Sequence, residues 1–312
     1  MSKAFDLNNP KQYLIDPGLN AALEVALDLG MPLLITGEPG TGKTQLAHHV
    51  AREMDCVLQE FYTKTTSKAR DLFYKYNALT HFRDSQHKGA GVNSMSYISF
   101  ECLGQAILDS PSKRSVVLID EIDKAPRDFP NDVLFEFAQL GFKVQESGAK
   151  EAAEWAKEQQ FALLPDEQGY FRFDPASGQR PILILTSNSE KNLPDAFMRR
   201  CVYYHIPFPS RERLAEIVSQ NLDISPDFQN RMLDHAVGYF LSIRRDHGLR
   251  KKPATAELLA WIHILHQKQF DLSQEFNEIE ARQAIENELE NTLSVLTKNR
   301  EDRERILESL QR

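Results

Sequence analysis

The sequence has few of the features that mark an exported or membrane-embedded chain. It contains three isolated cysteines, Cys56, Cys102 and Cys201, which provide neither a disulfide framework nor the CxxC spacing of a zinc site. Its longest purely apolar runs, VVLI at 116–119 and ILIL at 182–185, fall far short of the roughly 20 residues that span a bilayer. No apolar segment with a cleavage site opens the chain. We therefore expect no membrane segment, no export and a cytoplasmic location.

Positive charge is in the minority. The chain has 37 Lys and Arg against 45 Asp and Glu, a formal net charge of -8 at pH 7. A net negative field repels phosphate backbones, so nucleic-acid binding is disfavoured unless a local basic stretch compensates. One short stretch of this kind occurs, IRRDHGLRKK at 243–252. With 312 residues, 41% of them hydrophobic, the chain is long enough for a sizeable core and favours two domains.

The first two thirds of the sequence alternate strand-like and helix-like segments. This is the pattern of a parallel sheet flanked by helices. Several of the strand-like segments are continuous apolar runs, as expected for strands that are covered on both faces. The sequence therefore predicts an α/β fold with a doubly wound parallel sheet. Strands are expected at 32–36, 56–62, 115–119, 182–186 and 201–206.

The composition changes after PFPSRER at 207–213. Strand signals vanish there and long helical patterns continue to the end of the sequence. We predict an α/β domain over 1–209 and a smaller all-α domain over 210–312. One helix face of the second domain is marked by apolar residues at three- and four-residue spacing. These are Ile285, Leu289, Leu293 and Leu296.

Two segments interrupt the α/β rhythm. Residues 84–97 are polar and contain glycine, so we expect a loop that breaks a helix beginning near Ala69 and resuming near Leu103. The second segment, 146–180, contains a short charged helical pattern, EAAEWAKEQQ. A hairpin is expected around YFRFDPASGQRP at 170–181.

GEPGTGKT at 37–44 matches the pattern G-x-x-x-x-G-K-[ST] completely, between a strand-like and a helix-like segment. Its glycines let the backbone turn N–H groups toward phosphate oxygens, and the helix N-terminus adds positive potential. Lys43 is expected to reach the β- and γ-phosphates, and Thr44 to hold Mg²⁺ through its hydroxyl. The predicted nucleotide-binding residues are Gly37, Glu38, Pro39, Gly40, Thr41, Gly42, Lys43, Thr44 and Gln45.

VVLIDEIDKAP at 116–126 is an apolar strand that ends in two adjacent acids. In P-loop proteins the acid at the strand end supports Mg²⁺, so Asp120 is predicted as a metal ligand. Glu121 is placed to take a proton from a water that attacks the γ-phosphate, and it is predicted as the general base. Asp123 and Lys124 are expected to be surface or interface charges.

PILILTSN at 181–188 ends in polar residues at the same relative place as Asp120. An amide at this point, Asn188, can hydrogen-bond the attacking water or the γ-phosphate and align the reaction. The competing interpretation is that Asn188 is a turn residue after a strand. Further on, LPDAFMRRC at 193–201 carries two adjacent arginines where the chain turns.

Taken together, the P-loop, LIDEIDKAP, LTSN and LPDAFMRRC resemble an AAA+ ATPase of the MoxR-type branch, over residues 12–305. The resemblance implies a five-stranded parallel sheet, with the LTSN strand between the P-loop and acid-pair strands, and a helical lid domain. It also implies ring assembly, usually a hexamer, with ATP and Mg²⁺ held between subunits. The implied catalytic residues are Glu121, Asn188 and an arginine finger, Arg200, with Arg199 as second choice or helper. Alternatively, one of the two arginines bridges an acid of the adjacent subunit.

The resemblance has one departure. The family carries a lid-domain arginine, called sensor 2, in a G-A-S-P-R-like stretch. The nearest match, LRKKPATAELL at 249–259, has Ala254 where that arginine falls. Arg250, Lys251 and Lys252 are candidate substitutes, the lysines only as point charges.

The two interrupting segments resemble the family's helix-2 insert and its hairpin before the sensor strand. Both are then expected to face the ring axis or one rim and to handle the client, with Tyr97 and Phe100 as residues to test.

The resulting interpretation is a cytoplasmic ring ATPase that remodels or matures a protein client. The MoxR-type resemblance implies a partner with a von Willebrand A domain. The alternative is an AAA+ motor or loader that acts on nucleic acid through a local basic surface. A third possibility, a nucleotide switch without hydrolysis, is disfavoured by Glu121. The basic surface of the alternative would consist of Arg244, Arg245, Arg250, Lys251 and Lys252.

Overall fold

The computed structural model describes residues 13–88, 93–245, 248–268 and 290–310. Two of the apolar residues expected on the last helix, Ile285 and Leu289, lie outside the described residues.

The chain divides into two compact units, which we call the sheet unit and the helical unit. The short segment Glu38–Gly42 of the P-loop groups with the helical unit, although its two neighbours in sequence belong to the sheet unit. The domain boundary expected at residue 209 stays a prediction. The sheet unit comprises Ile15–Gly37 and Lys43–Ile206, and the helical unit Met1–Leu14, Glu38–Gly42 and Pro207–Arg312.

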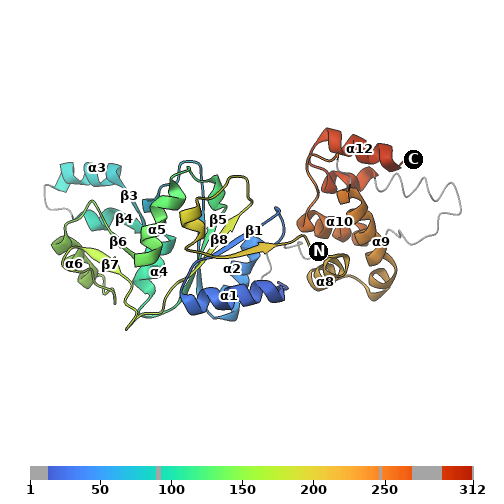
Figure 1. Ribbon diagram of the computed structural model, residues 1–312. Helices are drawn as coiled ribbons and strands as arrows, with labels where there is room; N and C mark the ends of the chain where they lie inside the picture. The colour runs from blue at the N-terminus through green and yellow to red at the C-terminus, as the bar shows by residue number, and fades with distance from the viewer. Residues whose placement is uncertain (1–12, 89–92, 246–247, 269–289, 311–312) are drawn as a thin grey trace. The chain divides into compact units, whose positions relative to one another are not determined.

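The sheet unit contains a five-stranded parallel sheet in the order β2-β5-β8-β1-β9 (Figure 1). The predicted fold class is confirmed, and β8 lies between β1 and β5 as the resemblance implied. The three central strands are fully buried, whereas β2 and β9 are partly exposed at the sheet edges. Burial on both faces explains why the central strands are continuous apolar runs. The strands are β1 (Leu33–Gly37), β2 (Val57–Tyr62), β5 (Ser115–Asp120), β8 (Ile182–Ser187) and β9 (Val202–Ile206).

Helices connect these strands. The first helix, α1, begins where the Asp16 carboxylate accepts the N–H groups of Gly18 and Leu19, with Pro17 at its first position. This cap and the proline are typical of a helix N-terminus. The helices are α1 (Pro17–Leu29), α2 (Lys43–Glu53), α4 (Cys102–Asp109), α5 (Phe129–Gln139) and α7 (Asp195–Met198), with the short 3-10 turn η4 (Ile122–Lys124).

The prediction of one helix interrupted by a loop was wrong. After the 3-10 turn η2 (Ala69–Leu72), the strand β3 (Tyr74–Tyr76) pairs antiparallel with β4 (Ile98–Phe100). The helix α3 (Ala78–Lys88) lies between these strands in sequence, and the 3-10 turn η3 (Ser94–Tyr97) precedes β4. YKY and ISF alternate apolar and polar residues, a period of two that belongs to strands.

The second insert contains the predicted charged helix, α6 (Ala149–Glu158). The expected hairpin around 170–181 was wrong in its pairing. The strand β7 (Tyr170–Arg172) pairs antiparallel with β6 (Gly141–Lys143), which lies before α6. We call the segment from η2 to β4 the first insert, and the segment from β6 to β7 the second insert; both gather at one end of the sheet unit (Figure 1).

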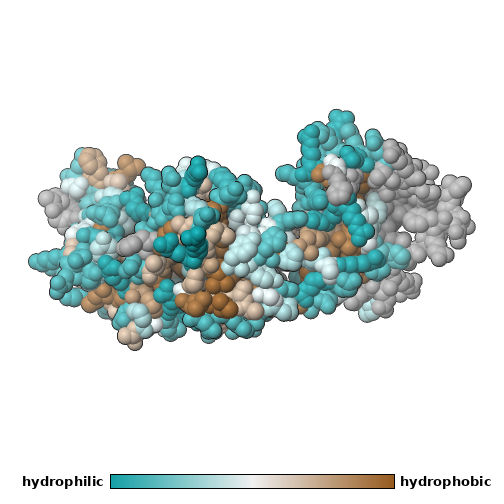
Figure 2. Space-filling view, in the orientation of Figure 1, coloured by the Kyte–Doolittle hydropathy of each residue, from teal (hydrophilic) through white to brown (hydrophobic). Residues whose placement is uncertain are grey.

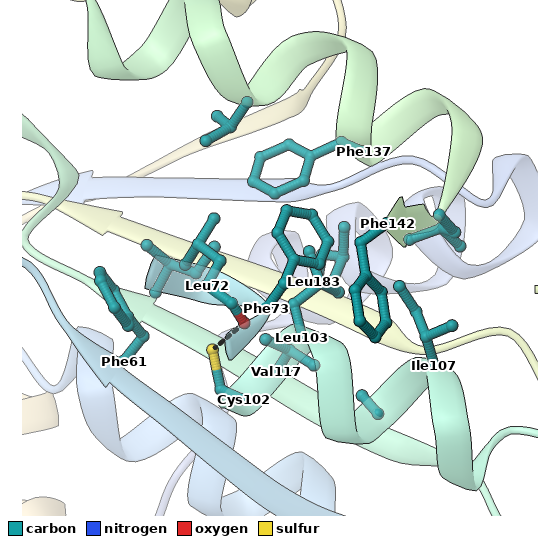
Figure 3. Packing of buried hydrophobic residues seen from close by; sticks show 14 of the residues in the cluster. Phe61, Leu72, Phe73, Cys102, Leu103, Ile107, Val117, Phe137, Phe142 and Leu183 are labelled. Carbon is teal, nitrogen blue, oxygen red and sulfur yellow. Dashed lines mark hydrogen bonds between the residues drawn. The ribbon is translucent and has the colours of Figure 1, made fainter. Parts of the chain in front are cut away.

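Aromatic side chains join the inserts to the sheet unit's core. Figure 3 shows the rings of Phe73 and Phe142 close together beside Leu103 of α4; their centroids are 5.4 Å apart. Phe100 packs against Trp155 and Phe171, with ring centroids 5.9 and 6.3 Å apart. Phe100 is thus part of the packing between the inserts, and a role of Phe100 or Tyr97 in client contact stays a prediction.

Two of the cysteines belong to this unit's interior. The Cys102 thiol contacts the carbonyl oxygen of Leu72 at 3.7 Å (Figure 3). Burial raises the pKa of Cys102 and Cys201 to about 12, so neither thiol is a reactive thiolate near neutral pH. Cys56 is half-buried, and all three are free thiols.

The helical unit packs around Trp261, which is fully buried and donates its indole N–H to the Thr292 hydroxyl at 3.0 Å. Leu293 and Leu296 lie in this core, as their spacing predicted. No helix among the described residues is long and apolar enough to cross a membrane. The helices are α8 (Arg211–Asn221), α9 (Pro226–Arg245), α10 (Thr255–Gln267) and α12 (Arg300–Leu310), and 290–296 are also helical.

The contact between α4 and the first insert allows a stability test. A Cβ atom at Gly104 would lie 2.0 Å from the carbonyl oxygen of Phe73, which is backbone and cannot rotate away. We expect Gly104→Ala to lower the free energy of unfolding by about 1–3 kcal/mol, because overpacking forces the backbone to shift. The measurement is the urea midpoint by circular dichroism.

Gly148→Ala is the matched control. A Cβ atom at Gly148 meets nothing within 4 Å, and the residue precedes α6 with φ -74°. We expect a cost below about 1 kcal/mol there. If Gly104→Ala and Gly148→Ala shifted the urea midpoint equally, the close packing of α4 against Phe73 would be contradicted.

Candidate functional site

The candidate site lies where three central strands end. In the parallel register, Thr36 of β1 lies beside Ser187 of β8, and Ile119 of β5 beside Leu185. The P-loop, the acid pair and Asn188 therefore follow strand ends at one edge of the sheet. In open α/β sheets this carboxyl edge is where ligands bind.

The P-loop has the local geometry of a phosphate cradle. Gly40 and Gly42 have φ of 76° and 87°, values that residues with a Cβ rarely adopt. Lys43 is the first residue of α2, and its buried ammonium donates to the carbonyl oxygen of Gly37 at 2.9 Å. The next two residues, Thr44 and Gln45, lie in the first turn of α2. A helix N-terminus with a lysine and left-handed glycines suits an anionic phosphate.

The Asp120 carboxylate joins three segments. Its Oδ1 atom accepts hydrogen bonds from the hydroxyls of Thr44, at 3.0 Å, and Thr186, at 2.5 Å. A hydroxyl and a carboxylate are oxygen ligands of the kind that Mg²⁺ prefers, so the predicted pair of Thr44 and Asp120 fits that ion. The described residues contain no group of three or more His, Cys, Asp or Glu arranged for a metal.

Glu121 is held on both sides. It adopts a left-handed conformation with φ 55°, and its N–H donates to the Thr186 hydroxyl at 2.8 Å. Its Oε1 accepts the side-chain amide of Asn188 at 3.0 Å, and its Oε2 pairs with the ammonium of Lys124. The hydrogen bond to Glu121 raises the pKa of Lys124. The structure thus brings together the predicted base and the predicted aligning amide.

The expectation for Asp123 was wrong. Asp123 is 2% exposed and accepts the backbone N–H groups of Asn188, at 3.3 Å, and Glu190, at 2.9 Å. A buried carboxylate needs such partners, and here they come from the loop that follows β8. Asp123 therefore fixes the loop that carries Asn188.

Sequence reasoning also missed Thr186. Its hydroxyl donates to Asp120 and accepts from the N–H of Glu121, so it links the two acids to β8. The signal was present, because the hydroxyl interrupts the apolar run ILIL just before the strand ends.

The two arginines lie at the amino ends of the parallel strands, opposite the carboxyl ends where the P-loop and the acid pair follow. Arg199 and Arg200 are exposed, and Arg200 donates to the carbonyl oxygen of Ala196 at 3.0 Å. They precede Val202, the first residue of β9, which lies beside Leu33 at the start of β1. The P-loop follows the opposite end of β1, about 16 Å along the strand. The structure therefore does not bring the arginines to the P-loop of their own chain.

Arg244 is another residue that the sequence did not single out for the P-loop. Within the helical unit, its guanidinium lies 2.5 Å from the Glu38 carboxylate, donates to the Pro253 carbonyl oxygen, and stacks over the Phe208 ring. A Cβ atom at Gly40 would lie 2.7 Å from the Cβ of Ala254. Ala254 thus lies against Gly40, in the P-loop segment that belongs to the helical unit.

Unlike Arg244, the three residues proposed as sensor 2 substitutes have no described contact with the P-loop. Arg250 pairs with Glu301 at 2.7 Å, and the backbone N–H groups of Arg250 and Lys251 donate to Asp302. Lys252 is exposed. Among the described residues of this unit, Arg244 is a cation that contacts a P-loop residue, Glu38.

The sequence profile of the AAA domain (dynein-related subfamily) matches residues 32–201, more than half of the chain. The chain belongs to this AAA family. The match contains every strand of the five-stranded sheet except β9, and it contains both inserts. Members of the family are P-loop ATPases, and AAA+ proteins typically assemble into rings.

Two solved structures are similar to this AAA protein. One is the RuvB Holliday junction branch migration motor of Thermotoga maritima, at 15% identity, covering 93% of this chain and 76% of that chain, with a TM-score of 0.42. The other is an alanine-to-serine mutant of RuvB from the same organism, at 18% identity, covering 96% and 75%, with a TM-score of 0.44. A comparison with curated proteins found no match.

Thr186, whose hydroxyl links the Asp120 carboxylate to the Glu121 N–H, allows a binding test. Thr186→Val keeps the shape but removes the hydroxyl that holds Asp120, so we expect magnesium–ADP to bind about 10-fold more weakly, the usual effect of losing an outer-shell partner. The Glu121 N–H also loses its acceptor, which costs about 1–3 kcal/mol of stability. Isothermal titration and urea denaturation measure the two effects.

Thr186→Ser keeps the hydroxyl and serves as the control, with affinity for magnesium–ADP close to that of the unmodified protein. Equal affinities of the Val and Ser variants would show that this hydroxyl does not support Asp120.

Proposed function

We propose that this AAA protein hydrolyses ATP to ADP and phosphate, with Mg²⁺ as cofactor. The observation that carries the proposal is the contact between Glu121 and Asn188 at the sheet edge where Asp120 meets Thr44. A carboxylate base beside an amide, one residue after a Mg²⁺-type carboxylate, is the set that water attack on a γ-phosphate needs.

Each residue has a part in this reaction. The P-loop amides and Lys43 would bind the phosphates. Thr44 and Asp120 would hold Mg²⁺, which would neutralise charge on the β- and γ-phosphates. Asn188 orients the water. The oxygen of this water forms a bond to the γ-phosphorus while the bond from that phosphorus to the β–γ bridging oxygen breaks. A proton of the water passes to the Glu121 carboxylate.

We further propose that Arg200 completes the site of a neighbouring copy in a ring, which is expected to be a hexamer. The support is the position of Arg200 at the edge opposite its own P-loop. Its guanidinium stays charged and binds phosphate oxygens bidentately. Arg199 is exposed beside it and is the second candidate.

The proposed cellular role is remodelling or maturation of a protein client, in the manner of MoxR-type proteins, in the cytoplasm and with a von Willebrand A domain partner. Exposed apolar side chains on the first insert support a protein client. Leu79 and Phe82 of α3 are 84% and 65% exposed, and Figure 2 shows hydrophobic surface over α3. Apolar side chains that gather at an insert tip are typical of a site for protein contact.

The nucleic-acid alternative loses one member of its basic surface. Arg244 is buried and paired with Glu38, so it is not presented to a phosphate backbone. Arg245, Arg250, Lys251 and Lys252 remain exposed. Binding to DNA with a steep salt dependence would favour this alternative.

The test of the ring site mixes two inactive variants. Glu121→Gln removes the base, and Arg200→Ala removes the finger, which we expect to slow hydrolysis by roughly 10³-fold or more. Mixed rings place an intact Arg200 beside an intact Glu121 of another subunit, so we expect hydrolysis to recover. Phosphate release at saturating ATP is the measurement.

Arg52→Ala is the control for loss of an exposed arginine, since Arg52 pairs with the adjacent Glu53 at the end of α2. It is expected to hydrolyse ATP normally. Normal hydrolysis by Arg200→Ala alone would remove this residue from the site, and Arg199→Ala would then be tested in the same mixture.

The client surface is tested with Leu79→Ala/Phe82→Ala. Both side chains are exposed, so we expect unchanged basal hydrolysis. Half-maximal stimulation by an unfolded probe, reduced and carboxymethylated α-lactalbumin, should need roughly 10-fold more probe, because two apolar contacts are lost.

Val25→Ala/Leu29→Ala is the matched control on α1, where both side chains are also exposed. It should respond to the probe normally. An equal loss in both double variants, or no stimulation of the unmodified protein, would contradict a client site on α3.

A further inference from the structure

The carboxylate of Glu121 is engaged at both oxygens. The Asn188 amide donates to Oε1 at 3.0 Å, and the Lys124 ammonium pairs with Oε2. A general base needs a lone pair directed at the water whose proton it takes. An ammonium group on Oε2 competes with that water and draws electron density from the carboxylate. The structure thus shows the base in a restrained arrangement.

The backbone keeps Lys124 beside Glu121. The N–H of Lys124 donates to the carbonyl oxygen of Glu121 at 2.9 Å across the turn η4. The N–H of Glu121 is in turn held by Thr186. Because the backbone is held at both residues, rotation of the side chains can separate the Lys124 ammonium from the Glu121 carboxylate without a change of fold.

Lys124 has another acid within electrostatic reach. Its pKa is raised first by the hydrogen bond to Glu121, and further by the charges of Glu121, Glu190 and Asp123. Asp123 is buried on two backbone N–H groups, whereas Glu190 is exposed. The Lys124 side chain is 41% exposed. It can therefore leave Glu121 for solvent and Glu190 without becoming a buried, unpaired charge.

We propose that Lys124 is a positioning residue that restrains Glu121, and that ATP hydrolysis proceeds when Lys124 swings away from the carboxylate. The proposal rests on the function proposed above for Glu121. In this proposal the ion pair between Lys124 and Glu121 slows basal ATP hydrolysis, and the rate rises when the Lys124 ammonium moves away from Glu121. Asn188 stays on Oε1 and continues to orient the water.

The test is the single-turnover rate of ATP hydrolysis by Lys124→Met, which removes the charge and keeps the aliphatic stem. We expect a rate at least about threefold faster than that of the unmodified protein, because the base is unmasked. The Kd for ATP should stay within about twofold, since Lys124 does not bind the phosphates. Lys124→Arg restores a cation and should restore the slow rate.

Lys113→Met is the matched control, because Lys113 is also half-exposed and pairs with an acid, Asp109, before the start of β5. It should leave the rate unchanged. Lys124→Gln provides a second neutral variant if Lys124→Met does not assemble. A rate that is unchanged or slower in both neutral variants, with normal ATP affinity, would overturn the proposal.

A double variant separates this proposal from the function on which it rests. Glu121→Gln/Lys124→Met should be as slow as Glu121→Gln alone, because the acceleration acts through Glu121. If Lys124→Met still accelerates hydrolysis when the Glu121 carboxylate is absent, the proposed restraint of Glu121 by Lys124 is wrong, whereas the proposed ATPase activity is unaffected. Normal hydrolysis by Glu121→Gln alone would instead overturn Glu121 as the base.

Discussion

The hydrogen bonds that converge on Asp120 are the interaction on which the candidate site depends. Two threonine hydroxyls meet on one carboxylate oxygen, one from the helix after the P-loop and one from β8. The Thr186 hydroxyl then accepts the N–H of Glu121, so a single chain of hydrogen bonds runs from Thr44 to the proposed base. Because each member satisfies its neighbour at a buried or half-buried position, a shift of any one would leave a polar group unpaired.

The direction of the strands gives this sheet two different ends. Polar residues that follow β1, β5 and β8 gather at the carboxyl edge, whereas the arginines that precede β9 lie at the amino edge. Under the proposed function, the two groups would act on one nucleotide although they lie apart within one chain. The proposed chemistry would then require assembly, because the two groups could meet only between copies.

The sequence predicted well what depends on local pattern. The buried strands are apolar runs, and parallel pairing brings their polar ends together, so the pattern alone was enough to place Asp120, Glu121 and Asn188 at one edge. It failed where contacts are long-range. β3 and β4 have three residues each, so their alternation of apolar and polar residues is too short to identify a strand by itself, and β7 pairs with a strand 29 residues earlier. The burial of Asp123 depends on backbone groups of a loop more than 60 residues away.

The packing of Phe100 among the rings of both inserts has a consequence for how this protein can change. The inserts are anchored at their base by buried aromatic rings, while α3 carries Leu79 and Phe82 on its solvent side. Substitutions at those two exposed positions remove little buried surface and so cost little folding free energy. The proposed client surface could therefore change in sequence without disturbing the candidate site, because packed aromatic rings lie between α3 and the core of the sheet unit.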